Sequence, residues 1–292
     1  MKSAPEVPWD KEEDWAFVTD YPPKDWAGSG QGKQDQVVDW TESVQQAIDA
    51  GKSTVAFPPG PKYMIRGTVH IRGKVRRFLG LESEWANVIN QQQRGQILVE
   101  DGDSPVVVWE QFKASYAGLL FTHIGKRTWV NRNNSYNQYT SITKMPGSGD
   151  LFLDDMCWGH LNIQGGNVWA RQQNNEGTKV FTTKVLNDGG NLWILGFKTE
   201  DDAVLIHTRN GGRTEVLGGF IYANKANDPN KIMFLCEDSF MSFSVAEAVI
   251  RKQPFAPIRV RRGGEEKTLT HGNAYPRAGG SLVPLFVENP EN

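Results

Sequence analysis

The sequence predicts an all-β protein, a right-handed parallel β-helix with one capping helix near its N-terminus. Three observations favour this fold class. The 292 residues include 30 glycines and 15 prolines, which is typical of a turn-rich chain. Short runs of β-branched and aromatic residues alternate with glycine-containing corners. From Lys126 to Gly212 these corners recur about every 21.5 residues, the length of one coil of a β-solenoid.

Composition excludes several classes of function. Lys and Arg number 32 against 34 for Asp and Glu, so the chain lacks the positive field that phosphate backbones attract, and we expect no nucleic-acid partner. The longest apolar runs have the length of strands, and we expect no membrane span. The two cysteines, Cys157 and Cys236, are too far apart for a disulfide framework or a close-spaced zinc site. We expect ordinary buried thiols.

Residues 1–36 are predicted to form an irregular N-terminal arm with one short strand at 15–18. Prolines interrupt this segment, which carries an acidic patch and three tryptophans: Asp10, Glu12, Glu13, Asp14, Trp9, Trp15 and Trp26. Isolated tryptophans need a surface on which to bury. We therefore expect the arm to lie on the rest of the fold. No apolar segment follows Lys2, so the sequence as given predicts no secretory signal.

The capping helix is predicted over 39–50. Asp39 can cap its N-terminus, Glu42 can return the hydrogen bond, and Gly51 stands where a left-handed C-terminal cap belongs. A strand at 54–57 and the turn Pro58-Pro59-Gly60 follow.

The coils then run to about residue 222. Two columns after the corners are small or branched and are expected to face the interior: Thr128, Leu151, Val168, Leu192 and Thr214, and Val130, Leu153, Ala170, Ile194 and Val216. The position between them is expected to face outward and forms an aromatic ladder with one acidic member: Trp129, Phe152, Trp169, Trp193 and Glu215.

The C-terminal part is predicted to close the solenoid. A hairpin is expected from 258–261 and 267–270 around Gly263-Gly264, and the tail from 271 can cover the last coil. The predicted organisation is an arm over 1–36, the β-helix over 37–250, and a C-terminal hairpin and tail over 251–292.

The segment from Trp15 to Gly60 resembles the N-terminal module of the pectate-lyase-like superfamily of right-handed β-helices. The Asp-capped helix at 39–49, the strand with its Pro-Gly turn and 63–65 carry the resemblance, whereas 28–32 depart from the usual Gly-Asp-Gly. The family includes polysaccharide lyases, phage tailspike depolymerases and two-lobed exo-β-1,3-glucanases, one lobe of which this chain resembles. The resemblance implies a polysaccharide or oligosaccharide partner and an extracellular or periplasmic location. Because the matched residues are scaffold residues, no catalytic position is carried over.

Two acidic clusters follow coil strands and are the candidate catalytic residues. The clusters are Asp150, Asp154 and Asp155, and Glu200, Asp201 and Asp202, with Glu237 and Asp238 as a third option. A glycosidase needs one protonated and one ionised carboxyl group, whereas a lyase can use carboxylates to bind Ca²⁺. Turn formation is the alternative role of these residues. No other cofactor or metal is expected.

The aromatic ladder is the candidate substrate-binding surface, with Trp129, Trp169, Trp193 and Arg171 as its residues. Stacked indoles can bind sugar rings through their apolar faces. Alternatively the arm or a neighbouring subunit covers the ladder, or the ladder faces the interior. Cover by a neighbouring subunit would make the protein a homo-oligomer.

A basic stripe alternates with apolar residues between 65 and 76. Its members are Arg66, Thr68, His70, Arg72, Lys74 and Arg76. A uronate lyase could use such a row to bind carboxylates, whereas a solvated face paired with the acidic arm is the alternative.

These features favour a polysaccharide-degrading glycoside hydrolase. The alternatives are a polysaccharide lyase and a non-catalytic glycan-binding or structural β-helix that completes its site by oligomerising. Serine-hydrolase elbows, zinc-protease motifs and phosphate loops are absent from the sequence.

Overall fold

The computed structural model describes residues 1–26, 38–85, 94–113, 118–136, 138–176, 181–200, 203–223, 232–249, 258–269, 275–277 and 280–289. These residues are mostly β and form a parallel β-solenoid with one α-helix near the N-terminus, which confirms the predicted fold class. The chain divides into two compact units, Lys2–Trp158 and Gly159–Asn292, called here the N-terminal and C-terminal units. The predicted boundaries after residues 36 and 250 lie outside the described residues.

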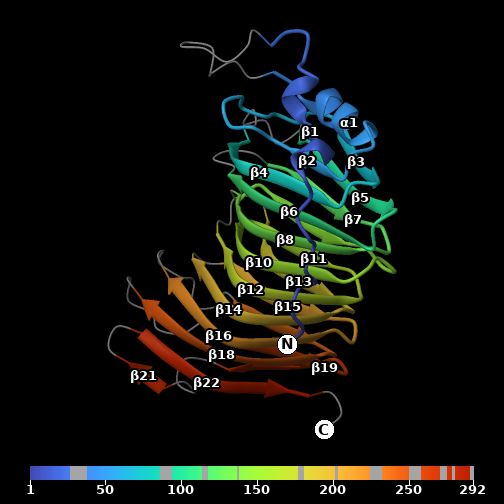
Figure 1. Cartoon of the computed structure of the whole chain (residues 1–292). Helices are drawn as coiled ribbons and strands as arrows, with labels where there is room; N and C mark the ends of the chain where they lie inside the picture. The colour runs from blue at the N-terminus through green and yellow to red at the C-terminus, as the bar shows by residue number, and fades with distance from the viewer. Residues whose placement is uncertain are drawn as a thin grey trace. The chain divides into compact units, whose positions relative to one another are not determined.

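The N-terminal unit winds two parallel sheets around a common interior (Figure 1). The first sheet has the order β1-β2-β4-β6-β8-β10 and the second the order β3-β5-β7-β9. The elements are η1 Glu12–Asp14, β1 Trp15–Phe17, η2 Val18–Asp20, α1 Thr41–Asp49, β2 Thr54–Ala56, β3 Thr68–Gly73, β4 Arg77–Glu84, β5 Gln96–Gly102, β6 Val106–Lys113, β7 Leu120–His123, β8 Thr128–Ser135, β9 Ser141–Lys144 and β10 Leu151–Trp158.

The C-terminal unit repeats this arrangement with the orders β12-β14-β16-β18-β22-β21 and β11-β13-β15-β17-β19-β20. Its elements are β11 His160–Ile163, β12 Asn167–Asn175, β13 Thr183–Asp188, β14 Asn191–Glu200, β15 Val204–Arg209, β16 Arg213–Ala223, β17 Phe234–Glu237, β18 Phe240–Val249, β19 Ile258–Arg262, β20 Glu265–Leu269, β21 Tyr275–Arg277 and β22 Gly280–Glu288. The strands β20 and β22 pair antiparallel, the first with β19 and the second with β18. The predicted hairpin around Gly263-Gly264 is thereby confirmed.

Glycine makes the corners that the repeat predicted. Gly73, Gly165, Gly189 and Gly211 adopt positive φ angles of 63° to 105°, a conformation open to glycine at little steric cost. A second bend, which the sequence did not predict, lies inside the long strands. There the left-handed residues are mostly not glycine: Leu81, Glu82, Gln111, Asn133, Asp155, Gln172, Gly196 and Gly218.

The helix α1 is shorter than predicted, and its N-terminus is capped differently. Asp39 Oδ1 accepts hydrogen bonds from the backbone N–H of Thr41 at 3.0 Å and from its hydroxyl at 2.6 Å. Glu42 does not return a bond to Asp39 but accepts one from Gln46 at 3.4 Å. Gly51 has the predicted left-handed conformation, with φ 73°.

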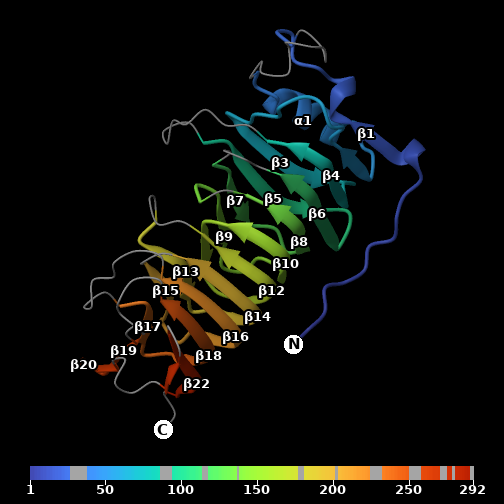
Figure 2. The ribbon, with the colours of Figure 1, turned by 90° about the vertical axis from the view of Figure 1, so that its left-hand side faces the viewer.

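The N-terminal arm lies on the N-terminal unit as expected and is the dark blue trace that ends at the point marked N (Figure 2). Trp26 packs edge-on against Trp40, with ring centroids 5.2 Å apart, and Trp15 is half-buried. Residues 27–36 of the predicted arm lie outside the described residues.

Within the part of the chain that the structure describes, no helix is long and apolar enough to cross a membrane.

Candidate functional site

The predicted aromatic ladder divides between the interior and the outer face of the sheets. Trp129 pairs in register with Leu151, and Val130 pairs with Phe152. Trp129 therefore faces the interior, where it is fully buried next to Phe121 and His123. Its interpretation as an outward, substrate-binding residue is wrong by one position in the register.

The shift arises at the corner before β8. Arg127 turns inward there and is almost fully buried, and its guanidinium donates hydrogen bonds to the carbonyls of Val75 at 3.0 Å and Ile71 at 2.7 Å. This corner therefore takes up one residue more than the later corners. The sequence pattern marked the corner by its glycine and could not reveal the additional residue.

Trp169 and Trp193 lie in register on the outer face of the C-terminal unit, as predicted for the ladder, and their role in substrate binding stays a prediction. They are register partners on β12 and β14, and their rings stack with centroids 5.2 Å apart and planes 6° from parallel. Trp169 is 8% exposed and Trp193 is half-buried. The pair, called here the aromatic platform, is a stack of two parallel indoles on the outer face of this sheet.

Apolar and charged residues surround the platform. Glu215 is the register partner of Trp193 on β16 and is half-buried. Leu195 and Leu217, which pair with each other on the same strands, are 45% and 58% exposed. Arg171 is the partner of Leu195 on β12. The alternation that exposed Trp193 places Leu195 two residues further on the same face, a signal that our sequence reasoning did not use.

The first acidic cluster does not form an isolated pair of carboxylates. Asp154 is the register partner of Arg132 on β8, and Asp155 is exposed in a left-handed bend with φ 54°. Asp150 binds the Lys2 ammonium at 2.8 Å. Aspartate is among the few residues that tolerate the left-handed region, which gives Asp155 a structural role.

The second cluster is described only at Glu200, since Asp201 and Asp202 lie outside the described residues. The Lys198 ammonium binds Glu200 at 2.5 Å and Glu176 at 2.6 Å, so one cation joins two carboxylates. Partial burial would raise the pKa of Glu176, but hydrogen bonds from Lys198 and Asn174 and the charge of Lys198 lower it overall. Glu176 is therefore held in its ionised form.

The third acidic option is part of an ion-pair chain. Glu237 binds His207 Nε2 at 2.7 Å and Arg261 at 2.5 Å. Partial burial opposes ionisation of Glu237, yet hydrogen bonds from Arg261 and His207 lower its pKa overall. Asp238 adopts φ 43° at the adjacent turn and accepts a hydrogen bond from the backbone of Gly263.

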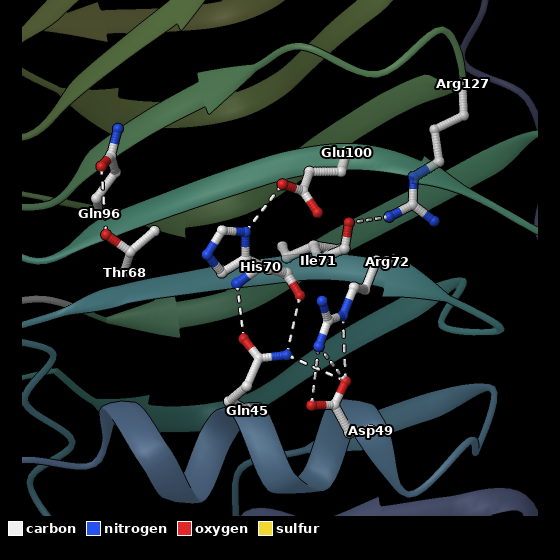
Figure 3. Close-up of polar contacts among 9 residues, drawn as sticks. All are labelled: Gln45, Asp49, Thr68, His70, Ile71, Arg72, Gln96, Glu100 and Arg127. Atoms are coloured by element: carbon white, nitrogen blue, oxygen red, sulfur yellow. Dashed lines mark hydrogen bonds and ion pairs between the residues drawn. The ribbon is translucent and has the colours of Figure 1, made fainter.

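The basic stripe alternates with buried residues as predicted, and carboxylates bind three of its members. Figure 3 shows Arg72 bound to Asp49 of α1 and the His70 ring next to Glu100 of β5. His70 Nδ1 lies 2.9 Å from the Glu100 carboxylate. Arg76 binds Asp10 of the arm. These pairs support the reading of the stripe as a structural, charge-paired face.

The described residues were compared with the requirements of a metal site, and the chain was compared with known proteins. Among the residues that the structure describes, no group of three or more His, Cys, Asp or Glu side chains is arranged to hold a metal ion, and the Ca²⁺ of a lyase stays an untested prediction. Comparison of the chain with protein-family models, with curated proteins and with solved structures finds no significant match.

Proposed function

We propose that this protein is a carbohydrate-binding β-solenoid of the pectate-lyase-like kind, similar to one lobe of the two-lobed glucanases, and that it binds a glycan on the outer face of β12, β14 and β16. The observation that carries the proposal is the stacked pair of Trp169 and Trp193. The indole face of Trp193 that Trp169 does not cover suits the apolar face of a sugar ring.

The second face of the Trp193 ring is the contact point for a sugar. Trp169 covers the face on the side of β12, and the opposite face is turned toward the position of Glu215 on β16. A pyranose stacked there would place its hydroxyl groups near the Glu215 carboxylate, which can accept hydrogen bonds. Leu195 and Leu217 extend the apolar surface beside it.

Glu176 suits the ionised member of a glycosidase pair and not its proton donor. A glycosidase needs one carboxyl group whose pKa is raised so that it can donate a proton. Glu176, which shares Lys198 with Glu200, has a lowered pKa instead. Hydrolysis that involves Glu200, Asp201 and Asp202, or lysis of a uronate, stays a prediction.

A binding screen tests the proposal. Neutral β-glucans and uronate polymers are titrated into the wild-type protein and into Trp193→Ala, with calorimetry or co-sedimentation as the readout. Loss of the stacking contact should weaken binding by about threefold to tenfold. Trp9→Phe is the matched control, because Trp9 is an exposed tryptophan of the N-terminal unit, outside this platform.

The same incubations are assayed for reducing ends and for the absorbance of unsaturated products. Binding that Trp193→Ala weakens, without either product, is the expected result. Retention of full affinity by Trp193→Ala, or failure of every polymer to bind, would refute the proposed site. Release of reducing ends or unsaturated products would replace binding by hydrolysis or lysis.

A further inference from the structure

The outer face of the N-terminal unit holds a column of residues that point away from the interior and are nevertheless buried. Successive register partners form it, and each is at most 1% exposed: Thr54, Arg77, Val108, Val130 and Phe152. The arm segment, defined here as residues 2–10, contacts this column. It has no helix or strand of its own.

Side chains and one carbonyl anchor the arm segment at three points. At its start, the Lys2 ammonium binds Asp150 at 2.8 Å and lies over the Phe152 ring, 5.7 Å from its centroid. In its middle, the Val7 carbonyl accepts a hydrogen bond from Arg77 at 2.6 Å. The Trp9 ring covers the same guanidinium at 3.9 Å.

The third anchor is a buried carboxylate. Asp10 binds the Arg76 guanidinium and accepts a hydrogen bond from the Thr54 hydroxyl at 2.8 Å. Its side chain is only 5% exposed. Burial alone would raise the pKa of Asp10, but hydrogen bonds from Arg76, Thr54 and Ser53 lower it overall.

The charges of the face and of the arm segment are complementary at both ends. Asp150 receives a cation at one end, and Arg76 receives a carboxylate at the other. Between them, the Arg77 guanidinium donates a hydrogen bond to the Val7 carbonyl and lies under the Trp9 ring. The face therefore recognises an extended peptide by a pattern of side chains, and this pattern does not depend on the chain to which the peptide is attached.

We propose that this face is a peptide-docking face whose second occupant is the arm segment of another copy of the chain, so that two copies can exchange arms. The tether through Lys11 gives the chain's own arm an effective concentration of roughly millimolar, which favours the intramolecular contact in dilute solution. Exchange dominates once the charge of the arm segment no longer complements the charge of the face in the same chain.

A charge-swap experiment on full-length chains tests the exchange. Asp10→Lys reverses the charge of the third anchor of the arm segment, and Arg76→Glu reverses the charge of the residue on the face that binds this anchor. Each single variant should release its arm and show faster tryptic cleavage at Lys2 and Lys11 than the wild type. The double variant Asp10→Lys/Arg76→Glu restores the match within one chain and should be protected and monomeric.

An equimolar mixture of the two single variants should form a dimer, because each arm then matches only the other copy. Light scattering should give twice the chain mass of 32.7 kDa, and tryptic protection should return. A mixture that stays monomeric while the double variant is protected would show that the face accepts only its own arm. Wild-type protection in both single variants would remove Asp10 as an anchor. Either result overturns the proposal.

Discussion

Removal of the Glu110 carboxylate should destabilise the N-terminal unit strongly, because it leaves buried cations without a counter-charge. Glu110 is 2% exposed and binds Arg77, which is fully buried, and Arg132 at 2.7 Å. Breaking a buried ion pair by deleting one partner costs about 3–5 kcal/mol. We expect Glu110→Ala to lose free energy of unfolding in this range.

The matched control removes a carboxylate of the same type from the surface of the same sheet. Glu82 pairs with Lys113 at 2.6 Å, with side chains 57% and 62% exposed, and such pairs contribute about 0–1 kcal/mol. Urea unfolding followed by circular dichroism compares Glu82→Ala with Glu110→Ala. Because solenoid coils contact only their neighbours, hydrogen exchange should locate the loss in β4, β6 and β8.

A double variant separates the charge from the packing. Arg77→Met together with Glu110→Leu removes the cation and the anion at once, and apolar replacements of buried ion pairs are often neutral or stabilising. We expect this variant to recover most of the stability that Glu110→Ala loses. A loss below about 1 kcal/mol for Glu110→Ala, equal to that of Glu82→Ala, would refute a buried counter-charge role for Glu110.

Three further predictions follow from individual groups. Gln172→Gly should raise the free energy of unfolding, measured in urea, by about 0.5–1 kcal/mol. Gln172 has φ 52° at the bend where the next coil has Gly196. A loss of stability in this variant would show that Gln172 is not strained. Burial and the nearby cations Lys144 and Arg127 lower the pKa of His123 to about 4, although its hydrogen bond to the Arg127 carbonyl acts in the opposite direction. The stabilisation that neutral His123 gives the folded state should therefore be complete above pH 6.5 and be lost as the pH falls toward 4. Urea midpoints of His123→Gln should therefore fall less over that window than those of the wild type. Burial raises the pKa of Cys236 to about 12, and at pH 8 mass spectrometry should find Cys236 alkylated only after unfolding.

The periodic part of the fold could be predicted from the sequence because each coil repeats the same physical requirement. A glycine allows the corner, and alternation sorts the next side chains between the interior and the surface. Trp169 and Trp193 follow this rule and stack as expected. The hairpin around Gly263-Gly264 follows from turn chemistry alone, with φ 55° and 89° at the two glycines.

The rest depended on contacts between residues far apart in the sequence. Arg127 enters the corner to bond carbonyls of an earlier coil, and this long-range contact moved Trp129 to the interior. The bends within the long strands escaped prediction because residues such as Leu81, Gln111 and Gln172 carry no left-handed signature of the kind that glycine gives. Catalytic roles for Asp201 and Asp202 are untested for a different reason, since both lie outside the described residues.

Buried lysines of this solenoid bond backbone carbonyls near its corners. Strands pair their carbonyls with the neighbouring coil, but a corner leaves some carbonyls without a strand partner, and a buried unpaired carbonyl is costly. Long cationic side chains fill this need: Lys144 bonds the carbonyl of Ser148 at 3.0 Å, and Lys184 bonds the carbonyls of Asn175 and Glu200. These ammonium groups support the backbone and are not available to a ligand. The two proposed binding surfaces, the aromatic platform of the C-terminal unit and the peptide-docking face of the N-terminal unit, use outer faces instead.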